Sequence, residues 1–148
     1  MMNTRNTLCL CCILSLLWCT SCAPPTCYSR VLELSREITT ILDKLHTTVR
    51  TKACAVLLPT VFLDPHNSCI RTKLRDLLYV VENLPVELCR ERPRVRLLRR
   101  RTHTLLNIIS RACHRDLVFF TDDCEALETG NPSPRYTEDR LQRLVEDD

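Results

Sequence analysis

Residues 31–49 read VLELSREITTILDKLHTTV, and this stretch decides the fold class. Its apolar positions recur every three or four residues, at Val31, Leu34, Ile38, Ile41, Leu42, Leu45 and Val49. Polar side chains occupy positions between them, among them Arg36, Thr40, Asp43 and Thr47. Because an α-helix makes one turn in about 3.6 residues, this spacing gathers the apolar side chains into one stripe. The stretch therefore predicts a long amphipathic helix, capped at its start by Thr26 or Ser29.

Two later stretches show the same helical period. The first runs from about residue 67 to residue 84, with apolar positions Ile70, Leu74, Leu77, Leu78 and Val81. The second begins near Pro93, a residue favoured in the first turn of a helix, and extends to residue 112. Its apolar positions are Val95, Leu98, Thr102, Leu105, Ile109 and Ala112, and its other face carries Arg96, Arg100, His103, Asn107 and Arg111. Both stretches are therefore predicted to be amphipathic helices.

A fourth segment, residues 116–127, has two possible readings. Positions Leu117, Phe120, Cys124 and Leu127 suit a helix, whereas the run LVFF at 117–120 suits a strand. We predict a helix. The whole chain has one glycine, Gly130, and so has almost no residues for the tight turns of a hairpin-rich sheet. The composition therefore favours an all-α fold, and we predict a disulfide-braced bundle of four helices.

The N-terminal leader holds five of the eleven cysteines. It carries Arg5, an apolar run at residues 8–18 and small or polar residues up to Ala23, which is the order of a secretory signal. The apolar run is too short for the ~30 Å hydrocarbon core of a membrane. The predicted division is a removed signal peptide at 1–22, a helical domain at 23–128, and a linker with a mobile acidic tail at 129–148. We therefore expect an extracellular protein without a membrane-inserted segment.

The other six cysteines lie far apart, at Cys27, Cys54, Cys69, Cys89, Cys113 and Cys124. An even number of cysteines in an exported domain favours three disulfides, because disulfides persist outside the cell. Metal binding is the alternative, but none of these cysteines has the Cys-x-x-Cys spacing of a zinc site. We therefore predict no metal and no cofactor. The spacing favours none of the possible pairings.

The most basic segment is residues 90–101. It carries Arg90, Arg92, Arg94, Arg96, Arg99, Arg100 and Arg101, with Glu91 as its only acid. Guanidinium groups bind sulfates through paired hydrogen bonds, and the polyanion available outside the cell is glycosaminoglycan. The candidate heparan sulfate site comprises Arg94, Arg96, Arg99, Arg100 and Arg101. Nucleic acid is not an expected partner. The alternatives are a solvated helical face and a proprotein-processing site at Arg96-Leu97-Leu98-Arg99.

No arrangement of catalytic residues is found in the sequence. The four histidines, His46, His66, His103 and His114, form no His-Glu-x-x-His motif, and the chain has no Gly-x-Ser-x-Gly nucleophile turn. Asp122 and Asp123 adjoin Cys124, where helix capping or surface charge is the expected role. We therefore predict that the protein is not an enzyme.

Five short segments of the predicted domain are distinctive. They are PPTCYSR at 24–30, EIT at 37–39, LDPHNSC at 63–69, KLRD at 73–76 and RDLVFFTDDCEALE at 115–128. Together they resemble the cytokine-like protein 1 family of secreted proteins, and the resemblance extends to all six cysteines of the domain. It is weakest between residues 80 and 104, where this chain is far richer in arginine, and after residue 128.

The resemblance implies a cytokine-like bundle that acts as a secreted signalling ligand for a cell-surface receptor. It also implies roles in cartilage formation and homeostasis, in chondrocyte differentiation and in haematopoietic progenitor cells, and a chemokine receptor is suggested for the family. A chemokine fold is disfavoured, because the adjacent cysteines Cys11 and Cys12 lie in the leader and the amphipathic periods exceed one helix. The candidate receptor face comprises Arg36 and Asp43 on the first helix and Arg100 and Arg111 on the third. Matrix-binding modules and disulfide-rich inhibitors or carriers are the other functional classes.

Overall fold

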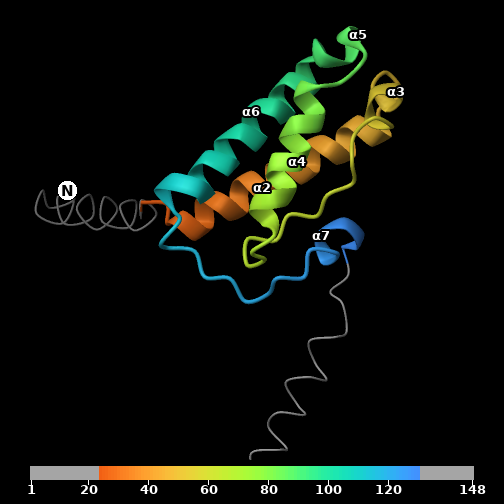
Figure 1. Cartoon of the computed structure of the whole chain (residues 1–148). Coiled ribbons are helices and arrows are strands. Elements are labelled where there is room, and N and C mark those ends of the chain that lie inside the picture. Colours follow the sequence, from red (N-terminus) through yellow and green to blue (C-terminus); the bar gives the residue numbers. More distant parts are fainter. Residues whose placement is uncertain (1–23, 131–148) are drawn as a thin grey trace, which may run out of the picture.

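The computed structural model describes residues 24–130, and their architecture is a bundle of three long helices (Figure 1). The long helices are α2 (Cys27–Thr47), α4 (Ile70–Glu82) and α6 (Pro93–Asn107). Three short helices, α3 (Lys52–Ala55), α5 (Glu87–Arg90) and α7 (Ala126–Thr129), lie outside them, and α6 continues as a π-helical turn, η1 (Ile108–Ala112). No strand occurs within residues 24–130. The predicted all-α class is therefore confirmed.

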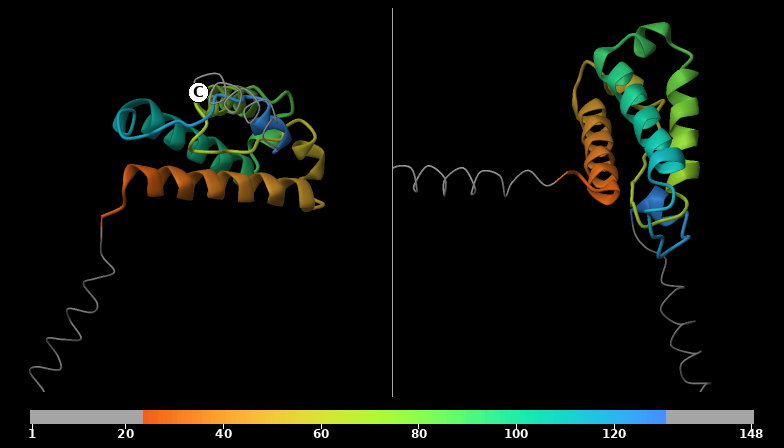
Figure 2. Two further views of the ribbon diagram at one scale, coloured as in Figure 1. Left: turned by 90° about the horizontal axis from the view of Figure 1, so that it is seen from below. Right: turned by 90° about the vertical axis from the view of Figure 1, so that its left-hand side faces the viewer.

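Helix α6 is the central element of the bundle. It packs against both α2 and α4, and Figure 2 shows it between them. It begins beside the end of α2, where Arg94 donates a hydrogen bond of 2.6 Å to Thr48 Oγ1. The chain after it returns to the start of α2, where Cys113 is bonded to Cys27. Helices α2 and α6 are therefore antiparallel.

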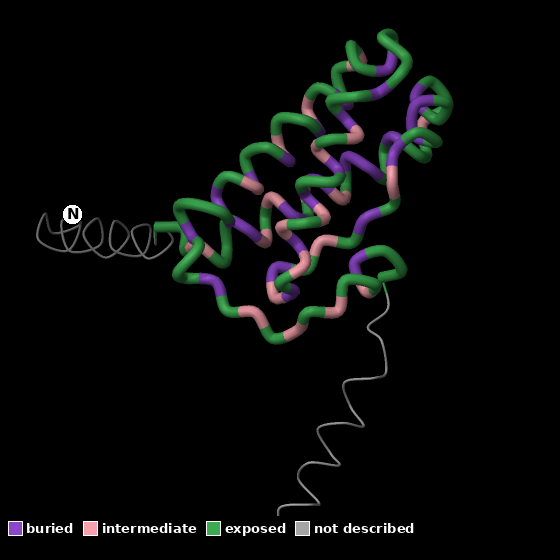
Figure 3. Tube along the Cα trace, in the orientation of Figure 1, coloured by how far each residue is buried: buried purple, intermediate pink, exposed green. Residues whose placement is uncertain are grey.

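The core consists of the apolar stripes of these three helices. Figure 3 shows the buried positions recurring along their inward sides. The fully buried side chains include Val31, Ile38, Leu45, Ile70, Leu74, Leu77, Val95, Leu98, Leu105 and Ile109. All of these positions belong to the three predicted stripes. Burial of the stripes is the main force that holds the helices together, because isolated helices of this length are marginally stable in water.

Helix α2 has a defined start and an earlier end than its apolar pattern predicts. Thr26 is the N-cap, and its Oγ1 accepts a hydrogen bond of 3.1 Å from the Ser29 amide. The helix ends at Thr47, since Thr48 adopts an extended conformation with φ −82° and ψ 123°. Val49 therefore lies outside the helix and is 90% exposed, so its assignment to the stripe is wrong. The chain then forms the single turn α3 and an irregular connection to α4.

The π-helical turn changes which residues face the core at the end of α6. The Cys113 amide donates a hydrogen bond of 2.8 Å to the Ile108 carbonyl, five residues earlier. A π-helical turn holds more residues than an α-helical turn and therefore shifts the following positions around the axis. Ile108 and Ile109 are both buried, whereas Ala112 is exposed. The prediction that Ala112 belongs to the apolar stripe is wrong for this reason.

The predicted fourth long helix, residues 116–127, does not form. Only the short α7 lies at its end, and residues 117–120 run without regular structure. In the middle of this segment, the backbone of residues 120 and 121 bonds to residues 66–68. The Phe120 amide donates to the His66 carbonyl at 2.9 Å, and the Ser68 amide donates to the Thr121 carbonyl at 2.9 Å. The strand reading is also wrong, because one isolated bridge between Asn67 and Thr121 makes no sheet.

Three disulfides brace the bundle, as predicted. They join Cys27 to Cys113, Cys54 to Cys89, and Cys69 to Cys124, with Cα atoms 5.5, 5.5 and 5.3 Å apart. The first links the start of α2 to the end of η1, and the second links α3 to α5. The third ties the start of α4 to the segment before α7. The alternative that these six cysteines bind a metal is therefore wrong.

The predicted signal peptide at 1–22 and nearly all of the predicted tail at 129–148 lie outside the described residues. Among residues 24–130, no helix combines the length and the apolar character that a membrane span requires. The same part of the chain contains no group of three or more His, Cys, Asp or Glu side chains arranged to hold a metal ion.

Candidate functional site

The outer face of α6 carries a group of three free arginines, Arg96, Arg99 and Arg100, which we call the arginine cluster. The apolar stripe of α6 faces the core, so these positions point outward, and all three residues are exposed. None of the three makes an ion pair or side-chain hydrogen bond within residues 24–130. Residues three and four positions apart on a helix are neighbours, so Arg96 adjoins both of the others. The cluster is therefore a local excess of positive charge.

Arg94 and Arg101, the other two members of the predicted sulfate-binding set, have a different role. Arg101 Nε donates a hydrogen bond of 2.8 Å to Glu37 Oε1, and Arg94 donates to Thr48 Oγ1 at 2.6 Å. Both contacts join α6 to α2. Partly exposed ion pairs contribute little to stability, about 0 to 1 kcal/mol. Their main consequence is that two of the five predicted arginines are engaged within the protein.

An open cleft of about 370 Å³ lies beside the arginine cluster. Its lining residues are Glu82, Leu97, Arg99, Arg100, Arg101, His103 and Thr104. All of them except Glu82 belong to α6, and Glu82 is the last residue of α4. The lining is therefore predominantly cationic and includes one carboxylate.

The four residues of the predicted receptor face are all exposed, but the structure does not bring them into one site. Arg36 and Arg100 directly precede the members of the Glu37–Arg101 ion pair and therefore lie at the same level of the bundle. Arg111 lies in η1, beside the start of α2, whereas Asp43 lies near the end of α2. Asp43 and Arg111 are therefore at opposite ends of the bundle.

A second surface, which the sequence does not predict, is formed by the rings of Tyr28, His66 and Phe120. We call it the aromatic cluster. The His66 ring centroid lies 4.9 Å from that of Tyr28 and 4.9 Å from that of Phe120. Despite these contacts Tyr28 is 41% exposed and Phe120 is 69% exposed. Val118, two residues before Phe120, is also exposed, and its carbonyl oxygen is 3.3 Å from His66 Nδ1. The result is an apolar patch on the surface.

The aromatic cluster is held in place by covalent and hydrogen-bonded supports. Cys27, next to Tyr28, is bonded to Cys113. Asn67, next to His66, is 1% exposed, and its Nδ2 donates to the Asp123 carbonyl at 2.6 Å. Asn67 Oδ1 in turn accepts from the Cys69 amide at 3.0 Å. The loop before α4 and the segment before α7 are therefore fixed to each other behind the rings.

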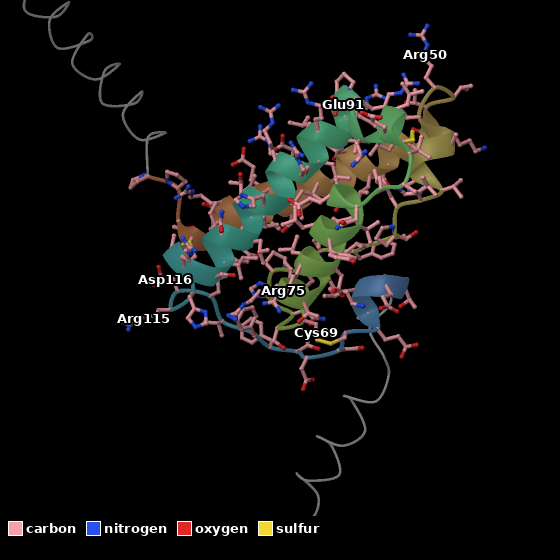
Figure 4. All side chains as sticks on the ribbon, turned by 45° about the horizontal axis from the view of Figure 1, so that its top comes forward. Arg50, Cys69, Arg75, Glu91, Arg115 and Asp116 are labelled. Atoms are coloured by element: carbon pink, nitrogen blue, oxygen red, sulfur yellow. A yellow bond between two sulfur atoms is a disulfide. The ribbon has the colours of Figure 1, made fainter. Side chains whose placement is uncertain are left out.

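Charged side chains of both signs lie at this end of the bundle, and the His66 amide itself donates a hydrogen bond of 2.9 Å to Asp64 Oδ1. Arg71 Nη2 donates a hydrogen bond of 3.0 Å to His114 Nδ1. Figure 4 shows Arg115 and Asp116 at this end of the bundle, away from Arg50 and Glu91 at the other end. Tyr28 lies in the first turn of α2, whereas Arg100 adjoins Arg101, which pairs with Glu37 about halfway along α2, so the arginine cluster and the aromatic cluster lie at different levels of the bundle.

One sequence signal does point to the aromatic cluster. Tyr28, His66 and Phe120 each lie in a segment that resembles the cytokine-like protein 1 family, namely PPTCYSR, LDPHNSC and RDLVFFTDDCEALE. The resemblance of these segments does not predict that the three rings contact one another. The contacts of residues 66–68 with residues 120–123 and the Cys69–Cys124 disulfide bring the last two segments together.

Replacement of Asn67 by alanine tests how firmly this part of the structure is supported. We expect the free energy of unfolding to fall by about 2 kcal/mol, because two half-buried backbone groups lose the hydrogen-bond partner that the buried Asn67 side chain provides. Urea denaturation followed by circular dichroism measures the change. Asn83→Ala is the control, since exposed Asn83 also bonds a carbonyl, that of Tyr79, but on the surface. An equal loss in both variants would contradict the structural role of Asn67.

Comparison with known proteins agrees with the resemblance noted in the sequence. The family model described as cytokine-like protein 1 matches residues 7–139. Cytokine-like protein 1 of Homo sapiens is 40% identical over 117 residues, which cover 79% of this chain and 82% of that protein. No solved structure matches the chain. The chain belongs to the cytokine-like protein 1 family.

Proposed function

We propose that the protein is a secreted cytokine-like ligand that signals through a cell-surface receptor. Membership of the cytokine-like protein 1 family is the observation that supports this function. The predicted signal peptide and the three disulfides are consistent with an extracellular protein. By family resemblance, the signal acts in cartilage formation and homeostasis and in chondrocyte differentiation, and a chemokine receptor is the receptor suggested for the family. The proposed role is recognition without catalysis.

The aromatic cluster is the proposed centre of the receptor contact. Tyrosine and other aromatic residues contribute much of the binding energy at protein interfaces, because they bury a large area at a small entropic cost. Tyr28 already stacks on His66 and Phe120 packs against it in a tilted orientation, so less conformational freedom is lost when a partner covers them. Exposed apolar groups of this kind often mark interaction sites.

Replacement of Phe120 by alanine tests this contact. We expect the dissociation constant for saturable binding to chondrocyte progenitor cells to rise on the order of tenfold, which is typical when an interface hot spot is removed. Binding of labelled protein to these cells provides the measurement. Tyr79→Ala is the matched control, because Tyr79 is also 69% exposed but lies on α4 and makes no ring contact within residues 24–130.

The outcomes of this experiment are distinct. Loss of affinity in Phe120→Ala with full affinity in Tyr79→Ala supports the proposed contact. Equal affinity of Phe120→Ala and the unaltered protein would show that the receptor contact is not centred on the aromatic cluster. The double variant Arg36→Ala and Asp43→Ala, measured on the same cells, tests the predicted receptor face on α2. Absence of any saturable binding by the unaltered protein would contradict the ligand function itself.

A further inference from the structure

We propose that the arginine cluster and the adjoining cleft bind a sulfated glycosaminoglycan of the heparan sulfate type. This site is separate from the aromatic cluster and adds a matrix-binding activity to the proposed receptor ligand. It rests on secretion, the part of the proposed function that brings the protein into contact with such glycans.

The first support is the unbalanced charge of the cluster. Arg96, Arg99 and Arg100 lie within about two turns of α6 and have no acidic partner among the described residues. Like charges at neighbouring helical positions repel one another. Two ion pairs occur within residues 24–130, and one of them joins Arg101 to Glu37. Acidic side chains are therefore present near this part of α6, but Arg96, Arg99 and Arg100 do not pair with them. A bound multivalent anion would lower the repulsion among these three guanidinium groups, because no acidic side chain of the described residues does so.

The second support is the length of the cationic face. Arg96, Arg100 and Arg111 are exposed, and α6 and η1 form one continuous rod. At a rise of about 1.5 Å per residue, Arg96 and Arg111 are roughly 20 Å apart. An extended polyanion can therefore contact several cations along one line. A small isolated anion cannot do so.

The third support is the chemistry of the cleft. Arg99 and Arg100 line it and provide planar groups suited to paired hydrogen bonds with sulfate oxygens. His103 and Thr104 line the same cleft and add polar side chains. Glu82, the lining residue that α4 provides, disfavours an anion on the α4 side and so directs the glycan along α6. An open cleft of this form suits a chain that passes through it.

The structure also narrows the set of residues involved. Arg94 and Arg101 already bond to α2, so they contribute to the positive field more than to direct sulfate contacts. We therefore expect substitutions at Arg96, Arg99 and Arg100 to have a larger effect than substitutions at Arg94 and Arg101. This ranking does not follow from the sequence, in which all five arginines are equivalent.

Heparin binding by the full secreted protein tests the site. In the triple variant Arg96→Ala, Arg99→Ala and Arg100→Ala, we expect the dissociation constant to rise roughly tenfold, the sum of three exposed ionic contacts. The matched control is Arg30→Ala, Arg75→Ala and Arg115→Ala, which removes the same charge from exposed positions outside α6. Surface plasmon resonance on immobilised heparin at fixed ionic strength gives both constants. Far-UV circular dichroism verifies that both variants are folded.

Three further comparisons separate the possible sources of binding. Desulfated heparin that retains its carboxylates should bind much more weakly than heparin, and inorganic sulfate should compete only at high concentration. The triple variant Arg96→Lys, Arg99→Lys and Arg100→Lys should retain part of the affinity, because lysine keeps the charge but not the paired hydrogen bonds.

Two results would overturn the site. One is an equal loss of affinity in the triple variant and its control, which would show that binding depends on the net charge of the protein and not on this site. The other is unchanged affinity in the triple variant. Neither result depends on the receptor, because the measurement uses only purified protein and glycan. Failure here and failure of the receptor proposal are therefore distinguishable.

Discussion

Replacing Cys27 and Cys113 together by alanine is expected to lower the free energy of unfolding by roughly 4 kcal/mol. These residues are 86 positions apart, the largest separation among the three disulfides. In the chain-entropy model a disulfide restricts the unfolded chain, and the restriction grows with the length of the closed loop. Since small domains are stable by about 5–15 kcal/mol, this loss is a large part of the total. The variant should melt at a much lower temperature than the unaltered protein.

The control for this prediction is the double variant Cys54→Ala and Cys89→Ala. Its disulfide joins residues 35 positions apart and so closes a shorter loop. The expected loss in the free energy of unfolding is therefore smaller by roughly 1 kcal/mol. Urea denaturation followed by circular dichroism measures both variants, and removing whole pairs avoids a free thiol that exchanges with other disulfides. If the shorter loop proved the more important for stability, chain entropy would not be the main source of stabilisation.

Replacing Leu98 by alanine is expected to cost about 3 kcal/mol of stability. Leu98 is 0% exposed and lies on α6, the helix that packs against both of its neighbours. Truncation removes apolar contacts and leaves a cavity that the surrounding helices cannot fill without moving. The loss should appear in thermal and urea unfolding, with little change in the helical circular dichroism signal at room temperature.

The matched control is Leu88→Ala. Leu88 is 66% exposed, so the same chemical change should alter stability by less than about 0.5 kcal/mol. A large difference between the two leucines confirms that α6 is the centre of the core. A cost at Leu98 as small as that at Leu88 would contradict the packing of α6 between α2 and α4.

Much of the helical structure is predictable from the sequence because it depends on local periodicity. The apolar positions of α2, α4 and α6 recur at the helical period, and the structure buries most of them. Errors arise where other forces determine the conformation. Residues 116–127 have helical spacing as well as an apolar run, but the backbone of Phe120 and Thr121, in the middle of the segment, bonds to residues 66–68. A pattern confined to one segment contains no information on such a partner.

The candidate surfaces are also predictable only in part from the sequence. The arginines of α6 are evident in the sequence, but the partners of Arg94 and Arg101 lie on or beside α2, some fifty residues or more away along the chain. The aromatic cluster draws its three rings from separate segments, and no spacing rule relates them. The disulfide pairing likewise depends on which segments the fold brings together.

The sequence alone determined the helical class, the three long amphipathic helices, the presence of three disulfides and the family, because periodicity, cysteine number and characteristic segments can be read along the chain. Only the tertiary structure decided the place of α6 between α2 and α4, the pairing of the cysteines, the loss of the fourth helix, which arginines are free, and the meeting of Tyr28, His66 and Phe120. These features depend on contacts between distant residues, and such contacts form only when the apolar stripes are buried together.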